Sequence, residues 1–158
     1  MKNQYFKKRK VDLYHSKKLE FFKCIKVDYE SENYLNRIRH FDQRRKFTKF
    51  RISDHKLAIE TGRYFKENIQ RYLRKYKCCN NDVIESEMHL LYHCPLYDNL
   101  RKELFGRINN RNQNNIFDNL EYTYDFFNSG NPSTNYYLSK FIEKCLKLRQ
   151  EKLLENEQ

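Results

Sequence analysis

The chain reads CCNNDVIESEMHLLYHC from residue 78 to residue 94, and this stretch holds three of its five cysteines and two of its five histidines. Thiolate and imidazole groups are ligands that Zn²⁺ prefers, and a structural zinc site is built from four of them. His89 and Cys94 are separated by four residues, so one helical turn running into a loop can aim both at one point. The stretch therefore predicts a short zinc-type hairpin near the middle of the chain.

Five side chains in this stretch are candidate metal ligands, and they differ in how easily they reach one ion. Cys79, His89 and Cys94 can converge, and the fourth ligand of a single Zn²⁺ is then either Cys78 or His93. Each of these two stands next to another candidate, and consecutive side chains diverge. The alternative interpretation is a small hairpin packed by thiols that binds no metal, because free cysteine packs as a small hydrophobe.

Composition limits the class of protein. The 158 residues correspond to one domain, 39% of them are hydrophobic, and three glycines and two prolines are too few for an all-β fold with many tight turns. No run approaches the roughly 18 apolar residues of a membrane span, and the basic first ten residues lack the apolar stretch of a signal peptide. We therefore expect an intracellular protein, in the nucleus or the cytoplasm, with reduced cysteines.

The spacing of apolar residues predicts a small, mostly α-helical domain. Helices are expected at about residues 11–25, 31–38, 42–52, 54–62, 85–92, 95–106, 116–127 and 134–153. Gly62 is expected to end the fourth of these helices. Residues 80–82 (Asn-Asn-Asp) favour the turn of the hairpin that leads into the zinc-type motif.

This pattern divides the chain into three parts. Residues 1–10 are expected to form a basic, flexible tail, residues 11–108 a zinc-binding region with preceding basic helices, and residues 109–158 a C-terminal helical extension. Within the central part, residues 63–77 alternate cations with aromatic residues and read as an exposed connection. Such alternation suits phosphate pairing and base stacking, and it equally suits an ordinary amphipathic surface.

Positive charge is concentrated ahead of the cysteine cluster. Residues 1–77 contain 23 Lys and Arg against 9 Asp and Glu, a net charge of +14, whereas residues 78–158 carry a net charge of −3. A region of this kind attracts polyanions, because each neutralised phosphate releases a condensed counterion. The candidate contacts to an RNA or DNA backbone are Arg44, Arg45, Lys49, Arg51, Lys75 and Lys77. The alternatives are an anionic lipid surface or a solvated basic face without a partner.

Two consecutive segments resemble a known family. Residues 48–64, which read TKFRISDHKLAIETGRY, are similar to the segment just before the zinc-binding motif at the C-terminal end of non-LTR (LINE-type) retrotransposon reverse transcriptases. Residues 79–101 resemble that motif itself, which is Cys-x2-Cys, a variable loop and His-x4-Cys. Cys79 matches the second cysteine, His89 and Cys94 match the final pair, and Tyr76 stands at the position of the first cysteine.

The resemblance implies an accessory module that grips template RNA or target DNA, and it does not bring a polymerase. Polymerase chemistry needs converging carboxylates that hold two metal ions, and the chain contains no Asp-Asp pair. A Gly-rich phosphate loop and a Gly-x-Ser-x-Gly elbow are also absent from the sequence. We therefore expect a binding protein and no enzyme. The alternative is a decayed retrotransposon fragment with a purely structural helical fold and neither metal nor partner.

Overall fold

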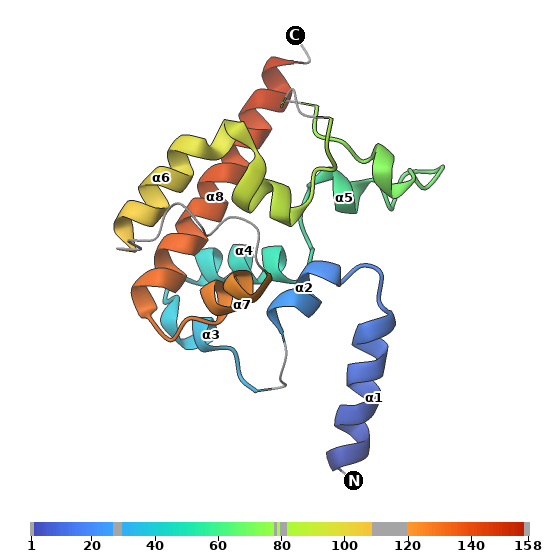
Figure 1. Cartoon of the computed structure of the whole chain (residues 1–158), viewed down its shortest axis with the longest axis vertical. Coiled ribbons are helices and arrows are strands. Elements are labelled where there is room, and N and C mark those ends of the chain that lie inside the picture. Colours follow the sequence, from blue (N-terminus) through green and yellow to red (C-terminus); the bar gives the residue numbers. More distant parts are fainter. Residues whose placement is uncertain (1, 27–29, 78, 80–81, 109–119, 157–158) are drawn as a thin grey trace.

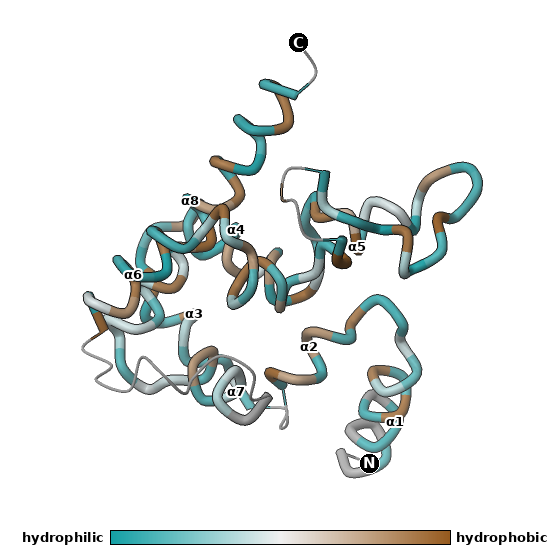
Figure 2. The backbone as a smooth tube through the Cα atoms, turned by 45° about the horizontal axis from the view of Figure 1, so that its top comes forward, coloured by the Kyte–Doolittle hydropathy of each residue, from teal (hydrophilic) through white to brown (hydrophobic). Residues whose placement is uncertain are grey.

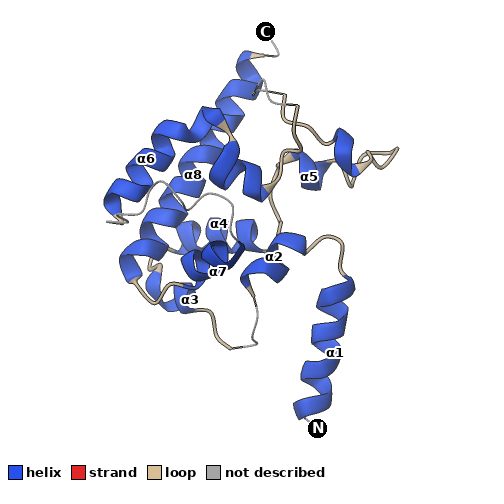
Figure 3. Cartoon of the chain, in the orientation of Figure 1, coloured by secondary structure: helices blue, strands red, loops and turns tan. Residues whose placement is uncertain are grey.

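The computed structural model describes residues 2–26, 30–77, 79, 82–108 and 120–156. Within these ranges the chain folds into helices joined by turns, with one antiparallel bridge between Lys75 and Ile84 (Figures 1 and 3). The α-helices are α1 (Lys2–His15), α2 (Glu20–Ile25), α3 (Asn33–Arg37), α4 (Phe41–Arg51), α5 (Ala58–Thr61), α6 (Asp98–Arg107), α7 (Leu120–Asn128) and α8 (Pro132–Glu155). The mostly α-helical fold predicted from the sequence is thus confirmed.

Helix α8 is the element against which much of the domain packs. It contacts α3, α4 and α6, and Figure 1 shows α6 lying alongside it. Its buried residues Leu138, Phe141, Ile142 and Cys145 follow the three- and four-residue spacing of one helical face. The helix begins earlier than the predicted residue 134, because the Asn131 side chain accepts a hydrogen bond from the amide of Ser133 at 2.9 Å and caps it.

Aromatic rings join α2, α4 and α7. The ring of Phe21 meets those of Phe50 and Phe127 edge-on, with centroids 5.6 and 5.3 Å apart. The ring of Phe47 is stacked on that of Phe127 at 5.6 Å. Such pairs contribute about 0.5–1.5 kcal/mol each beyond the burial of their surface. The aromatic residues that are frequent in this sequence therefore form much of the core.

Arg51 lies inside this aromatic core, so its prediction as a phosphate contact is wrong. The residue is 1% exposed, and its guanidinium donates hydrogen bonds to the carbonyl of Phe127 at 2.9 Å and to Glu32 at 2.5 Å. It also lies over the ring of Tyr34, 4.8 Å from the centroid. Burial lowers the pKa of Arg51, and the Glu32 carboxylate opposes that effect. A charge paired in this way inside the protein is not available to a nucleic acid.

The first predicted helix is divided in two. The chain turns between His15 and Glu20, so α1 and α2 are separate. Residues 2–10, expected to form a flexible tail, are helical and form the first turns of α1. In Figures 1 and 2, α1 extends away from the other helices. Residues 109–115, which separate two predicted helices, and the first residues of the helix predicted at 116–127 lie outside the described residues.

Candidate metal centre

The predicted hairpin brings Cys79 back toward the helical turn that carries the other ligands. Its two arms are joined by the bridge between Lys75 and Ile84 and by a hydrogen bond of 2.9 Å from the Glu85 amide to the Arg74 carbonyl. An ion pair of 2.5 Å between Lys75 and Asp82 links the arms further. The turn residues 80–81 lie outside the described residues.

A π-helical turn, η2 (His89–His93), positions the other two ligands. The amide of Cys94 donates to the carbonyl of His89 at 2.8 Å, a hydrogen bond that spans five residues. In an α-helix of 3.6 residues per turn, residue i+5 points about 140° away from residue i. The wider π-turn removes most of this divergence. At its start, the hydroxyl of Ser86 accepts a hydrogen bond from the His89 amide at 3.2 Å.

Cys79, His89 and Cys94 converge as the sequence predicts. Their three ligand atoms all lie within 4.8 Å of one another, and Cys79 Sγ lies 3.3 Å from His89 Nε2. Tetrahedral zinc with bonds of about 2.0–2.3 Å requires donors roughly 3.3–3.8 Å apart. His89 and Cys94 are buried, whereas Cys79 is half-buried. The Cys79–His89 separation lies in this range, and the three donors together could hold a metal ion.

The remaining candidate ligands do not join this group. His93 is exposed, because the turn that aligns His89 with Cys94 directs the residue before Cys94 elsewhere. The structure thus does not support His93 as a ligand, and Cys78 lies outside the described residues. Tyr76, at the position of the missing motif cysteine, is buried, and its ring centroid lies 6.4 Å from that of His89. Its hydroxyl is 3.3 Å from the hydroxyl of Tyr97.

The surroundings of Cys94 and His89 favour the uncharged forms of these two side chains. Burial raises the pKa of the Cys94 thiol, and the neighbouring Cys79 raises it further. Burial also lowers the pKa of the His89 imidazole. A bound divalent cation would reverse this preference for the thiol, because ligation requires the thiolate and releases its proton, whereas the neutral imidazole is already the ligating form.

Arg101 of α6 holds the end of the π-turn, a role that the sequence did not reveal. The residue is 5% exposed, and its guanidinium donates to the carbonyls of Leu90, at 3.1 Å, and Cys94, and to Asp98 at 2.5 Å. These bonds fix the backbone that carries the Cys94 side chain. The available signal was an arginine within an apolar stripe, since Arg101 shares the buried face of α6 with Leu104.

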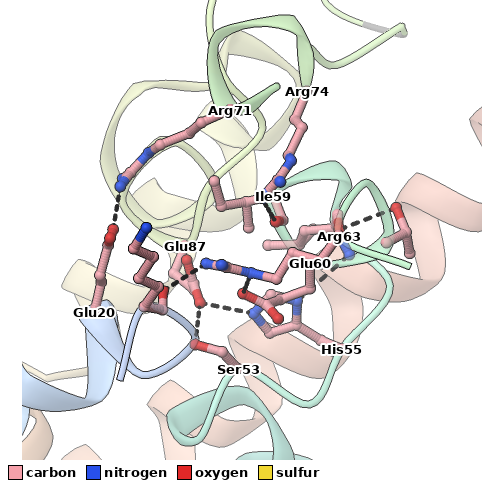
Figure 4. A network of polar contacts seen from close by, with 12 residues as sticks. Glu20, Ser53, His55, Ile59, Glu60, Arg63, Arg71, Arg74 and Glu87 are labelled. Carbon is pink, nitrogen blue, oxygen red and sulfur yellow. Dashed lines mark hydrogen bonds and ion pairs between the residues drawn. The ribbon is translucent and has the colours of Figure 1, made fainter. Parts of the chain in front are cut away.

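A second polar network holds Glu87, two residues before His89. The Glu87 carboxylate accepts hydrogen bonds from Ser53 Oγ at 2.6 Å and from His55 Nε2 at 3.0 Å, as Figure 4 shows. Burial opposes ionisation of this carboxyl, but the bonds from His55 and Ser53 outweigh it and hold the pKa of Glu87 below its usual value. The two segments that resemble the retrotransposon motif are therefore in direct contact.

The predicted phosphate contacts differ in how free they are. Arg45 of α4 and Lys77 of the hairpin are exposed. Arg44 is half-buried and donates to the carbonyls of Leu35 and Ile38, each at 3.2 Å. The other two are half-buried and ion-paired, as Lys49 lies 3.2 Å from Asp54 and Lys75 lies 2.5 Å from Asp82. These cations come from two separate elements of the fold.

Comparison of the chain with protein-family models, with curated protein sequences and with solved structures finds no match. The resemblance to the retrotransposon proteins therefore rests on the amino-acid sequence of residues 48–64 and 79–101 alone. Among the described helices, none combines the length and the apolar composition needed to cross a lipid bilayer.

Proposed function

We propose that this chain is a zinc-binding module that binds the backbone of RNA or DNA, similar to the C-terminal accessory region of LINE-type reverse transcriptases. The observation that supports it most directly is the convergence of Cys79, His89 and Cys94, because these are the three residues that match the motif. A solvated surface patch would not gather two thiols and an imidazole beside a buried arginine. A tetrahedral site needs a fourth ligand, for which Cys78 is the remaining candidate that the sequence offers.

The binding role is supported by charge. The net charge of +14 on residues 1–77 favours a polyanionic partner over a basic or neutral one. Contacts of this kind position a nucleic acid without reading its sequence. The chain acts without polymerase or endonuclease activity of its own, since the sequence offers no paired carboxylates for two-metal chemistry.

Zinc content tests the metal half of the proposal. Protein purified without chelator is expected to hold one equivalent of zinc by elemental analysis, and Cys94→Ser is expected to lose it. The matched control is Cys24→Ser, because Cys24 is a half-buried thiol outside the converging group. Less than about a tenth of an equivalent in the unmutated protein would contradict zinc binding. It would instead favour the alternative of a purely structural helical fragment, to which the buried Tyr76 contributes core packing.

Salt dependence tests the nucleic-acid half. For about four to six phosphate contacts, the logarithm of the association constant should fall against the logarithm of salt concentration with a slope of roughly −4 to −5 on duplex DNA. Fluorescence anisotropy with labelled oligonucleotides between low and moderate salt gives this slope. If no binding to RNA or DNA is detected at low salt, the basic half of the chain is only a solvated surface without a nucleic-acid partner.

A further inference from the structure

Residues 63–77 enclose two adjoining cavities of opposite character. One is an open groove of about 570 Å³, with Lys17, Arg63, Arg71 and Arg74 in its lining and Glu20 as the carboxylate among them. The other, of about 460 Å³, is mostly apolar, and its lining includes Phe65, Ile69, Leu73 and Tyr76. Ile69 and Arg74 line both cavities, so the two cavities adjoin at these residues.

The groove carries more positive charge than its own carboxylates balance. Arg71 pairs with Glu20, and Arg63 pairs with Glu60 at 3.0 Å. Arg74 donates instead to neutral acceptors, which are the carbonyls of Ile69 and Ile59, at 2.8 and 2.9 Å, and the side-chain oxygen of Asn68, at 3.2 Å. Figure 4 shows Arg71 reaching toward Glu20 while Arg74 points at Ile59.

Arg74 is the buried member of this group of cations. The residue is 7% exposed, and burial lowers its pKa. The neighbouring Arg63 and Arg71 lower the pKa further, while Glu60 and Glu20 oppose them. The lack of a side chain at Gly62 leaves room for Arg74, because an added Cβ would lie only 2.7 Å from Arg74 Cγ. A buried arginine fixed among other cations is stabilised by an anion that enters the groove.

Aromatic side chains on the same segment are exposed to solvent. Tyr64 is 71% exposed, and Phe65 and Tyr72 are each 61% exposed. These rings contribute little to the folded core in such positions. Rings beside cations are the means by which proteins hold single-stranded nucleic acid, because every base offers a face for stacking.

We infer that residues 63–77 form a binding site for single-stranded nucleic acid, with a phosphate in the cationic groove and a base in the adjoining apolar cavity. This inference rests on the proposed nucleic-acid-binding function and gives it a place and a strand preference. A duplex presents its phosphates but keeps its bases stacked inside, so it cannot fill the apolar cavity. The site is separate from the cations of α4, but it includes Lys75 and Lys77, which line the apolar cavity.

The test compares probes of different chemistry on the full-length, zinc-loaded protein. We expect a 12-nucleotide single-stranded oligouridine to bind more tightly than a 12-base-pair duplex of the same total concentration, and more tightly than phosphatidylcholine vesicles with a third of phosphatidylserine. Tighter binding to the duplex or to the vesicles would overturn the inference.

Substitutions then locate the site. Tyr72→Ala and Phe65→Ala are each expected to weaken single-strand binding by about 5- to 150-fold, the loss of one stacked base, with little change in salt slope. Glu20→Gln is expected to tighten binding, because it removes the carboxylate in the groove. The matched control is Phe41→Ala, since Phe41 of α4 is 66% exposed but lies outside both cavities, and it should leave affinity unchanged.

Failure of this inference is distinguishable from failure of the proposed function. If the unmutated protein binds nucleic acid and the Tyr72 and Phe65 variants bind single strands equally well, the site is elsewhere and the proposed function stands. If the unmutated protein binds no nucleic acid at low salt, both are wrong. Circular dichroism of each variant, whose changed residue is exposed or, for Glu20, half-buried, checks that the helices persist.

Discussion

Glu85 is a single residue that ties together three parts of the chain. Its carboxylate accepts a hydrogen bond from the Ala58 amide at the start of α5, at 2.6 Å. It also forms two hydrogen bonds with Arg149 of α8, at 2.5 and 2.8 Å, and the side chains of the pair are 3% and 12% exposed. Removing one member of a buried pair leaves the other charge without compensation.

Glu85→Gln is therefore expected to lower the free energy of unfolding by about 3–5 kcal/mol, measured by urea denaturation. The matched control is Glu103→Gln, because Glu103 pairs with Lys144 of α8 at 2.7 Å but both side chains are about half exposed. That control should cost less than about 1 kcal/mol. Equal losses in the two variants would show that the pair with Arg149 has no special weight.

Tyr76 provides a test of the resemblance at the same scale. Tyr76→Cys should destabilise the zinc-free protein, because it leaves a cavity beside Tyr97, and should tighten zinc binding by restoring the Cys-x2-Cys spacing. Tyr76→Ser makes a similar cavity without a thiol and serves as the control. Competition with a zinc-binding dye measures both affinities. If the two variants bind zinc equally, the position does not correspond to the motif cysteine.

Among the elements, the π-turn η2 determines whether the ligands meet, and α6 holds it through Arg101. Arg101→Met should weaken zinc binding by about 10- to 100-fold, because residues that orient ligands have effects of this size. Arg107→Met on the same helix is the control, since Arg107 is exposed. Dye competition again gives the affinity, and circular dichroism reports the helices. An unchanged affinity for Arg101→Met would mean that the turn holds its shape unaided.

Sequence periodicity located most helices because their buried faces recur every three or four residues. It missed the turn between α1 and α2, where Ser16, Lys17 and Lys18 offer neither glycine nor proline. It also placed the start of α8 too late, because Pro132 occupies the first turn of the helix, a position that proline favours. Gly62 does end α5, but with φ −63°, so its lack of a side chain serves the approach of Arg74 and not a left-handed cap.

The parts of the candidate site that are close together in sequence could be predicted. The contacts between residues that are distant in sequence could not. Cys79, His89 and Cys94 could be chosen from chemistry and spacing alone. Arg51 could not be recognised as buried, because its acceptors, Glu32 and the Phe127 carbonyl, are brought to it only by tertiary structure. Neither could the π-turn, since the same residues also satisfy an α-helical pattern.

For the molecule as a whole, the metal site is continuous with the core, so zinc binding and folding should be coupled. At free zinc of about 100 times the dissociation constant, binding adds about 2.7 kcal/mol to stability. For a chain of this length, that corresponds to a rise in Tm of about 5–10 °C. Calorimetry with and without a chelator measures the shift, and Cys94→Ser should show none. An equal Tm with and without the chelator would show that the converging thiols bind no metal that stabilises the fold.

The aromatic core that surrounds Arg51 cannot be completed early in the synthesis of the nascent chain. Arg51 bonds to the carbonyl of Phe127, which is 76 residues later. At about 5–20 residues per second, a ribosome needs roughly 4–15 s to add the 76 residues between them. During that interval the rings of Phe21, Phe47 and Phe50 lack their partner from α7. The emerging polypeptide therefore presents an aromatic surface to chaperones until α7 arrives.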